Sequence, residues 1–165
     1  IEHWQSKVLE VNQFGIDVLA GKNPFGVSDH ASLERYLATV FHNRDARPWV
    51  PWPAADIYIA QRRRDAAFEQ GVLDRIGRGD ERFLPGAEAA NISQPALLLW
   101  CREDKVIDAS AMTLYAARIP QASQVLLEGC GHMSLMERPG ETAEAVAMLI
   151  ERGAPGAAPP TGDTQ

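Results

Sequence analysis

Two residues, Asp104 and His132, have the types and the spacing needed for acid–base chemistry. Asp104 closely follows an apolar run that ends at Cys101, and His132 closely follows a second run that ends at Glu128. If these runs are neighbouring parallel strands, their loops meet at the carboxyl edge of the sheet, where reactive groups gather. An aspartate there can fix the tautomer of a histidine and stabilise its protonated form. The sequence therefore indicates an acid–base pair that would activate a nucleophile.

Each of these residues alone has a simpler interpretation. An aspartate after a strand is often a turn or cap residue, and a histidine after a glycine is often an ordinary loop residue. The occurrence of Asp104 and then His132 at matching strand ends favours the catalytic interpretation.

The elements that must position this pair follow the order strand, helix, strand, helix over residues 91–152. The apolar runs 95–101 and 123–128 are typical of strands buried on both faces of a parallel sheet. Helices are expected over 108–118 and from Pro139 onward. The side of the last helix that faces the sheet is predicted from three apolar residues, Val146, Leu149 and Ile150. Two strands alone do not make a stable sheet of this kind, so this half needs further strands.

Residues 1–90 are predicted to be mostly helical and irregular. One helix begins after Ser28 or Asp29, either of which can cap its free N–H groups. Apolar residues recur along it at helical spacing: Leu33, Tyr36, Leu37, Val40 and Phe41. It has to end before Arg47-Pro48, because a residue that precedes proline disfavours the helical region. A long helix is expected over 54–76. Its candidate buried residues are Ile57, Ala60, Phe68, Leu73 and Ile76.

The segment 48–53 is rich in proline and contains two tryptophans, Trp49 and Trp52. Its prolines rule out a regular helix or a central strand. The segment is either a packed loop or part of the wall of an apolar pocket, since tryptophan offers a large contact area at little entropic cost.

The composition limits the classes of function. A net charge of -6 argues against a nucleic-acid-binding surface, and the run Arg62–Arg64 is expected to be a solvated helix face. No stretch is long and apolar enough to span a membrane. Two cysteines, Cys101 and Cys130, are too few for a disulfide framework, so we expect free thiols. Residues 153–165 are predicted to be a disordered tail.

Two parts of the sequence resemble characteristic segments of α/β-hydrolases. Ile92–Pro95, Leu97–Trp100 and Arg102–Asp108 follow one another as in the segment that carries the catalytic acid of that family. Leu127–Met133 and Met136–Pro139 are similar to the segment that carries its catalytic histidine. The two segments occur here in the order and at the spacing of the family.

The combination most resembles the monoacylglycerol-lipase-like esterases of this superfamily, with a close resemblance over residues 91–150. It implies an α/β fold in which residues 91–152 form the last two parallel strands of the hydrolase core with flanking helices. Residues 1–90 would form the helical cap over the active site. The resemblance also implies that Asp104 is the triad acid and His132 the general base, and that no metal ion or cofactor is needed.

An apolar ester is the substrate that this resemblance implies, bound in a pocket beneath the cap. The candidate pocket residues are Trp49, Trp52 and Met133. The family usually has glycine at the position of Cys101, and the departure puts a thiol near the acid loop.

The nucleophile of this family is usually a serine in a Gly-x-Ser-x-Gly turn earlier in the chain. That motif does not occur in this sequence, and the nearest segment, Gly26–Asp29, does not match it. We therefore expect the nucleophile and the oxyanion hole in an N-terminal half that precedes Ile1 and acts as the partner of this chain. The chain alone is expected to be inactive and open to self-association. Its cellular location is left open, with the cytoplasm slightly favoured.

Two alternatives stay open. Epoxide hydrolases, haloalkane dehalogenases and carbon–carbon bond hydrolases share the strand-end histidine, and only the type of nucleophile, Ser or Asp, separates them. A non-catalytic binding or scaffold protein could also have kept the fold, and it would be monomeric, cooperatively folded and inert towards esters.

Overall fold

The structure, a computed structural model, describes residues 12–153. Its first part consists of helices and short 3-10 helices: α2 (Gln13–Leu19), α3 (His30–Val40), η1 (Arg44–Ala46), α4 (Ala54–Gly77), η2 (Asp80–Phe83), α5 (Leu84–Glu88) and η3 (Ala89–Asn91). Its second part alternates strands and helices: β1 (Leu97–Cys101), α6 (Ser110–Ala116), β2 (Ser123–Leu127), α7 (Ser134–Glu137) and α8 (Pro139–Gly153). Gly153 ends α8, and the rest of the predicted tail lies outside the described residues.

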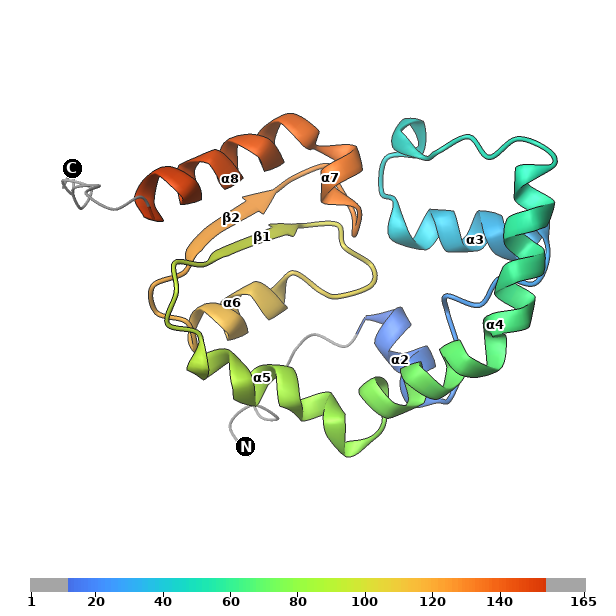
Figure 1. Cartoon of the computed structure of the whole chain (residues 1–165), viewed down its shortest axis with the longest axis horizontal. Helices are drawn as coiled ribbons and strands as arrows, with labels where there is room; N and C mark the ends of the chain where they lie inside the picture. Colours follow the sequence, from blue (N-terminus) through green and yellow to red (C-terminus); the bar gives the residue numbers. More distant parts are fainter. Residues whose placement is uncertain (1–11, 154–165) are drawn as a thin grey trace.

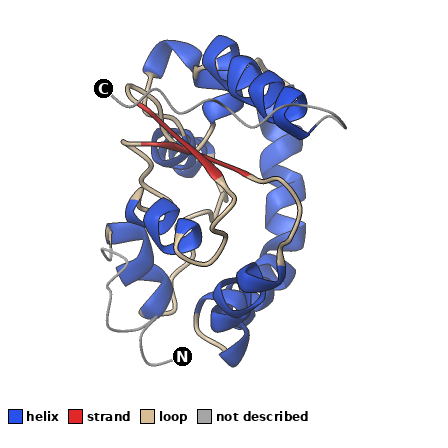
Figure 2. Ribbon diagram, turned by 90° about the vertical axis from the view of Figure 1, so that its left-hand side faces the viewer, coloured by secondary structure: helices blue, strands red, loops and turns tan. Residues whose placement is uncertain are grey.

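The second part has the predicted order of strands and helices. β1 and β2 pair in parallel, in a register that runs from Leu97 opposite Ser123 to Cys101 opposite Leu127. The crossover between them contains α6, which packs on β1, whereas α8 packs on both strands (Figure 1). Figure 2 shows the two strands twisted across each other with helices on both sides. Because the strands are parallel, the loops after Cys101 and Leu127 leave the sheet at the same edge.

The strands are less buried than the sequence predicted. In β1 only Cys101 is buried, and the other four positions are half-buried, while β2 has no fully buried residue. The expectation of burial on both faces fails because, within the described residues, the sheet has only two strands. Apolar side chains such as Leu98 and Val125 therefore have neighbours on too few sides to be enclosed.

Helix α3 shows how the sequence builds the first part. The Asp29 carboxylate accepts the Ser32 backbone N–H at 2.7 Å, and the Ser32 hydroxyl accepts the Asp29 backbone N–H at 2.9 Å, which forms a capping box. The Ser32 hydroxyl also donates to the Asp29 carboxylate, and this hydrogen bond lowers the pKa of that carboxyl. The apolar stripe of Leu33, Leu37 and Val40 is buried, as its helical spacing predicted.

The largest buried cluster joins the two parts of the chain. It contains the apolar stripe of α3 together with Val27, Phe41, Ala55, Ile59 and Val106. Val106 belongs to the loop that follows β1, so the helical part and the loop that carries Asp104 share one core. Burial of this cluster therefore fixes the position of α3 relative to the acid loop.

The long helix α4 forms as predicted, but its buried side differs from the prediction. Ala55 and Ile59 are its buried residues, and Ile57, Phe68 and Ile76 are 65%, 74% and 54% exposed. The contacts of α4 with α2 and α3 cover only one stripe of a helix that is apolar on several sides. No helix within residues 12–153 is long and apolar enough to cross a lipid bilayer.

Helix α8 begins at Pro139 as predicted, but its buried side is displaced. Thr142 and Ala145 are buried, whereas Val146 and Ile150 are 44% and 66% exposed. Leu149, the third predicted residue, is half-buried, so the side of α8 that packs on the strands follows the helical spacing of Thr142, Ala145 and Leu149.

Candidate active site

The structure brings Asp104 and His132 together at the carboxyl edge of the sheet. Asp104 lies in the loop after β1, and His132 in the loop after β2. The Nδ1 atom of His132 lies 2.9 Å from Oδ2 of Asp104. The parallel pairing of the strands produces this contact, since both loops start from the same edge.

The Asp104 carboxylate is held by its own loop. Its Oδ1 atom accepts the backbone N–H groups of Val106, at 2.8 Å, and Ile107, at 3.1 Å. The side chain is only 6% exposed. With Oδ1 occupied by the backbone, Oδ2 is left to accept a hydrogen bond from His132.

The His132 imidazole meets Asp104 through its Nδ1 atom. An ionised carboxylate only accepts hydrogen bonds, so this contact favours the tautomer with its proton on Nδ1, in which the Nε2 lone pair can accept another proton. The His132 side chain is 34% exposed, so Nε2 can be reached from outside the described part of the chain. A pocket of about 150 Å³ lies beside the pair and is lined by both residues.

The loop that carries His132 is tied to the acid loop through Glu103. The Oε2 atom of Glu103 accepts the backbone N–H groups of Gly129, at 2.9 Å, and Cys130, at 3.3 Å. Gly129 has φ +70°, a left-handed conformation that side chains disfavour. The turn at Gly129 therefore directs two successive N–H groups toward one carboxylate.

A disulfide between Cys101 and Cys130 forms a second tie between these loops. The expectation of two free thiols is therefore wrong. Cys101 is the last residue of β1, opposite Leu127, and the turn after β2 brings the Cys130 Cα within 5.3 Å of the Cys101 Cα. This separation lies in the range that a disulfide spans. Both cysteines are buried, so the covalent link between the two loops is shielded from solvent.

Glu137 is a site residue that our sequence interpretation missed. It is only 8% exposed, and its carboxylate accepts the backbone N–H groups of Gly131, at 2.7 Å, and Asn43, at 2.6 Å. The available signal was an acidic residue two positions before Pro139, where α8 begins, but helix-end rules alone predict only a favourable position near a helix N-terminus. The contact with Asn43 depends on the tertiary structure.

An apolar cavity of about 430 Å³ lies between the helical part and the histidine loop. Leu37 and Phe41 from the α3 segment, Val50 from the proline-rich loop and Tyr58 from α4 contribute to its lining. Met133, the predicted pocket residue next to His132, lines it too. Burial raises the pKa of the half-buried Tyr36, so this further lining phenol stays neutral.

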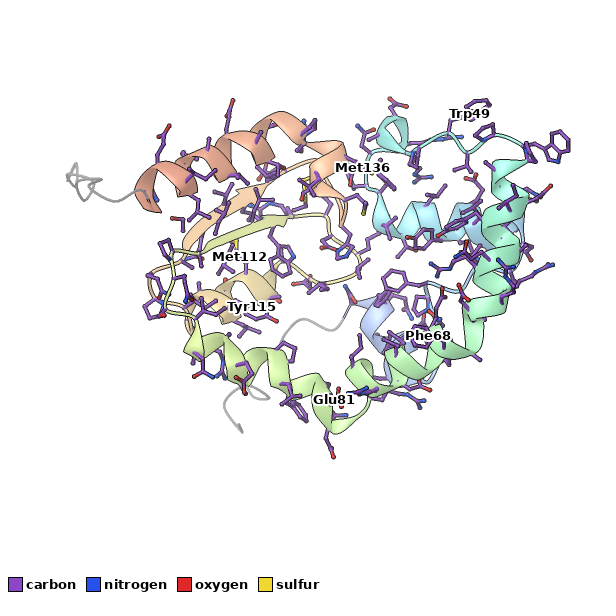
Figure 3. The ribbon with its side chains drawn as sticks, viewed as in Figure 1. Trp49, Phe68, Glu81, Met112, Tyr115 and Met136 are labelled. Atoms are coloured by element: carbon purple, nitrogen blue, oxygen red, sulfur yellow. A yellow bond between two sulfur atoms is a disulfide. The ribbon has the colours of Figure 1, made fainter. Side chains whose placement is uncertain are left out.

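The two tryptophans do not line this cavity. Trp49 and Trp52 are 85% and 80% exposed, and Figure 3 shows Trp49 on the outer side of the helical part. Met136 lies where α7 approaches α3, and it contributes to the cavity wall instead (Figure 3). In the same segment, Pro48 and Val50 line the cavity, whereas the two tryptophans are exposed. The role of the tryptophans in substrate binding stays a prediction.

The sequence model described as "Alpha/beta hydrolase family" matches residues 11–145. The chain belongs to this family. The two parallel strands, their flanking helices and the strand-end loops described above are thus part of an alpha/beta hydrolase fold.

Relatives and solved structures of this alpha/beta hydrolase chain include several lipases. It is similar to monoacylglycerol lipase ABHD6 of Mus musculus, with 36% identity over 84 residues that cover 51% of the chain and 25% of that protein. It is similar to Lipase 1 of Psychrobacter immobilis, with 25% identity over 99 residues that cover 59% of the chain and 30% of that protein. A solved membrane phospholipase A superposes with a TM-score of 0.67 and 26% identity, over 87% of this chain and 45% of that one.

The chain spans only part of the proteins that it matches. It covers a quarter of the length of the mouse lipase and less than half of the solved phospholipase. The similarity therefore establishes the family and the fold of the aligned part, and the activity of the whole protein is a matter for proposal.

Proposed function

We propose that this alpha/beta hydrolase chain supplies Asp104 as the acid and His132 as the general base of a catalytic triad in an ester hydrolase. The observation that supports the proposal is the 2.9 Å contact between His132 Nδ1 and Asp104 Oδ2 at the carboxyl edge of the sheet. The serine nucleophile and the oxyanion hole would come from an N-terminal segment that precedes Ile1, since the sequence contains no Gly-x-Ser-x-Gly turn.

In this mechanism His132 Nε2 accepts the proton of the serine hydroxyl as the serine oxygen attacks the ester carbonyl carbon. Asp104 stabilises the imidazolium that results, through the hydrogen bond at Nδ1. The proton then passes to the leaving alkoxide, which departs as the alcohol. A water molecule repeats the sequence on the acyl-enzyme, and the acid is released with the free serine.

The substrate that we propose is an ester with an apolar acyl group. The cavity next to Met133 has room for an acyl chain of moderate length, and its walls are apolar or neutral. Its position beside the His132 loop would place the ester carbonyl near the acid–base pair. The lipase names of the relatives are compatible with this substrate class.

We expect the histidine variant to test the proposal directly. In the protein that contains both this chain and the nucleophile, His132→Ala should lower kcat for short-chain p-nitrophenyl esters and monoacyl esters by a factor on the order of 10³ or more. His30→Ala is the matched control, because His30 pairs with Asp56 at 2.8 Å on an exposed part of the cap region. Unchanged ester hydrolysis by the His132 variant would contradict the assignment, and activity on epoxides or haloalkanes alone would redirect it.

A further inference from the structure

Glu137 is a buried carboxylate whose two oxygens bind different parts of the chain. Its Oε1 accepts the N–H of Gly131, the residue directly before His132, and its Oε2 accepts the N–H of Asn43, shortly after α3. The distances, 2.7 and 2.6 Å, are typical of charge-assisted hydrogen bonds. A buried carboxylate is tolerated only where such donors replace the lost water. The two N–H groups are therefore an integral part of this site.

The neighbouring charged side chains do not share this role. Arg138 donates to the carbonyl of Glu128 at 3.1 Å, and its other nitrogen lies 3.8 Å from Glu141. Both contacts are on the outer side of the turn between α7 and α8, and the Arg138 and Glu141 side chains are 40% and 52% exposed. Glu137 thus differs from its charged neighbours in burial and in the backbone groups that it binds.

Gly131 brings the histidine loop into direct contact with the end of α3. A Cβ atom at this position would lie 2.8 Å from the His42 nitrogen and 3.1 Å from the Val40 carbonyl oxygen, both backbone atoms that cannot rotate away. Only glycine fits between these groups. Since α3 also lines the apolar cavity, the Glu137 bridge links the backbone next to His132 with the wall of the cavity.

We propose that Glu137 is a positioning residue that holds the His132 loop in register with the end of α3. The inference rests on the proposed function, because it concerns the placement of the general base relative to the ester in the cavity. Glu137 does not contact the reacting atoms. It acts through the two N–H groups that it binds, one in the His132 loop at Gly131 and one after α3 at Asn43.

The variant Glu137→Gln tests this role with the least change in shape. The amide can accept one of the two N–H groups, but its own NH₂ group then faces the other donor, so one hydrogen bond is lost. We expect kcat for a p-nitrophenyl ester to fall about 10- to 100-fold per active site titrated with a fluorophosphonate, because small displacements of a general base have effects of this size. KM should change less than twofold. Glu141→Gln, on the exposed side of the same turn, should leave both constants unchanged.

A purely structural role for Glu137 would give a different result. The Gln variant would then melt at a lower temperature but turn over normally per titrated site, and this outcome would overturn the proposal. If His132→Ala removes activity and Glu137→Gln does not, only the positioning role fails. If neither variant affects activity, the proposed function itself fails.

Native-state hydrogen exchange on the unmodified protein provides a second test that does not depend on folding of a variant. The amides of Gly131 and Asn43 should exchange at least about 10³-fold more slowly than the intrinsic rates of the same residues in an unstructured chain, because they donate to a buried carboxylate. Exchange of either amide close to its intrinsic rate would overturn the proposal. Slow exchange of both would support the bridge.

Discussion

The Asp104 carboxylate receives hydrogen bonds from two different elements, its own loop and the histidine loop. The two backbone donors both bind Oδ1, so Oδ2 is left for the imidazole of His132. In the proposed mechanism this arrangement would preorganise the pair before a substrate binds.

Replacement of Asp104 by asparagine tests the importance of the tautomer. The amide oxygen can still accept the N–H groups of Val106 and Ile107, but the amide NH₂ then faces His132 Nδ1. The imidazole has to carry its proton on Nε2, where it can no longer act as a base. We expect kcat to fall by a factor on the order of 10⁴ with little change in melting temperature. Asp108→Asn is the control, because the Asp108 carboxylate accepts the Ser110 N–H within its own turn. Equal activity of the two variants would contradict the role of Asp104.

Among the helices and strands, the features that depend on neighbouring residues in the sequence could be predicted. Short stretches of sequence determine the start of α3 at Ser28 or Asp29, its apolar stripe and the two strands. The structure confirms the stripe and the strands, and it shows that Asp29 is the cap. The positions of Asp104 and His132 could be predicted as well, because parallel pairing dictates where strand-end loops meet.

Features that depend on contacts between distant segments could not be predicted in this way. The buried side of α4 was predicted wrongly, because apolar residues occur around most of the helix and only packing selects among them. The pairing of Cys101 with Cys130 depends on the register of two strands, which cysteine spacing does not contain. The bridge from Glu137 to Asn43 joins residues 94 positions apart.

The disulfide between the two strand-end loops should stabilise the fold measurably. It closes a loop with a sequence separation of 29, for which removal of chain entropy from the unfolded state predicts about 3–4 kcal/mol. We expect the double variant Cys101→Ser, Cys130→Ser to unfold at lower urea concentration by an amount that matches this free energy. A strong reductant should lower the midpoint of the unmodified protein and leave that of the double variant unchanged. Equal midpoints for both proteins under oxidising conditions would show that the disulfide does not form.

At the scale of the whole molecule, the described residues contain half-buried strands and large exposed apolar side chains. Each strand of the two-stranded sheet has one edge without a partner strand among residues 12–153. Exposed strand edges favour pairing with further chains. The proposed N-terminal half would provide the strands that complete this sheet.

The oligomeric state of the chain tests whether these strand edges need a partner. The 165-residue chain alone should elute from a size-exclusion column as species whose mass rises with concentration. Co-expression with the proposed N-terminal half should convert it to a stable one-to-one complex with esterase activity. A chain that stays monomeric at every concentration and unfolds cooperatively would instead favour a self-sufficient binding or scaffold domain.

The hydrogen bonds of Glu137 restrict the amino acids allowed near His132 more than those allowed at Asn43. The cap region contributes only the backbone N–H of Asn43, which every amino acid except proline provides. The histidine side needs a carboxylate at position 137 and the bare backbone of Gly131. Substitutions in residues 12–90 that preserve the buried cluster with Val106 can therefore reshape the cavity while this hydrogen bond to Glu137 persists. Under the proposed function, a change of substrate preference is expected to arise from substitutions in residues 12–90, with the carboxyl edge of the sheet that carries Asp104 and His132 unchanged.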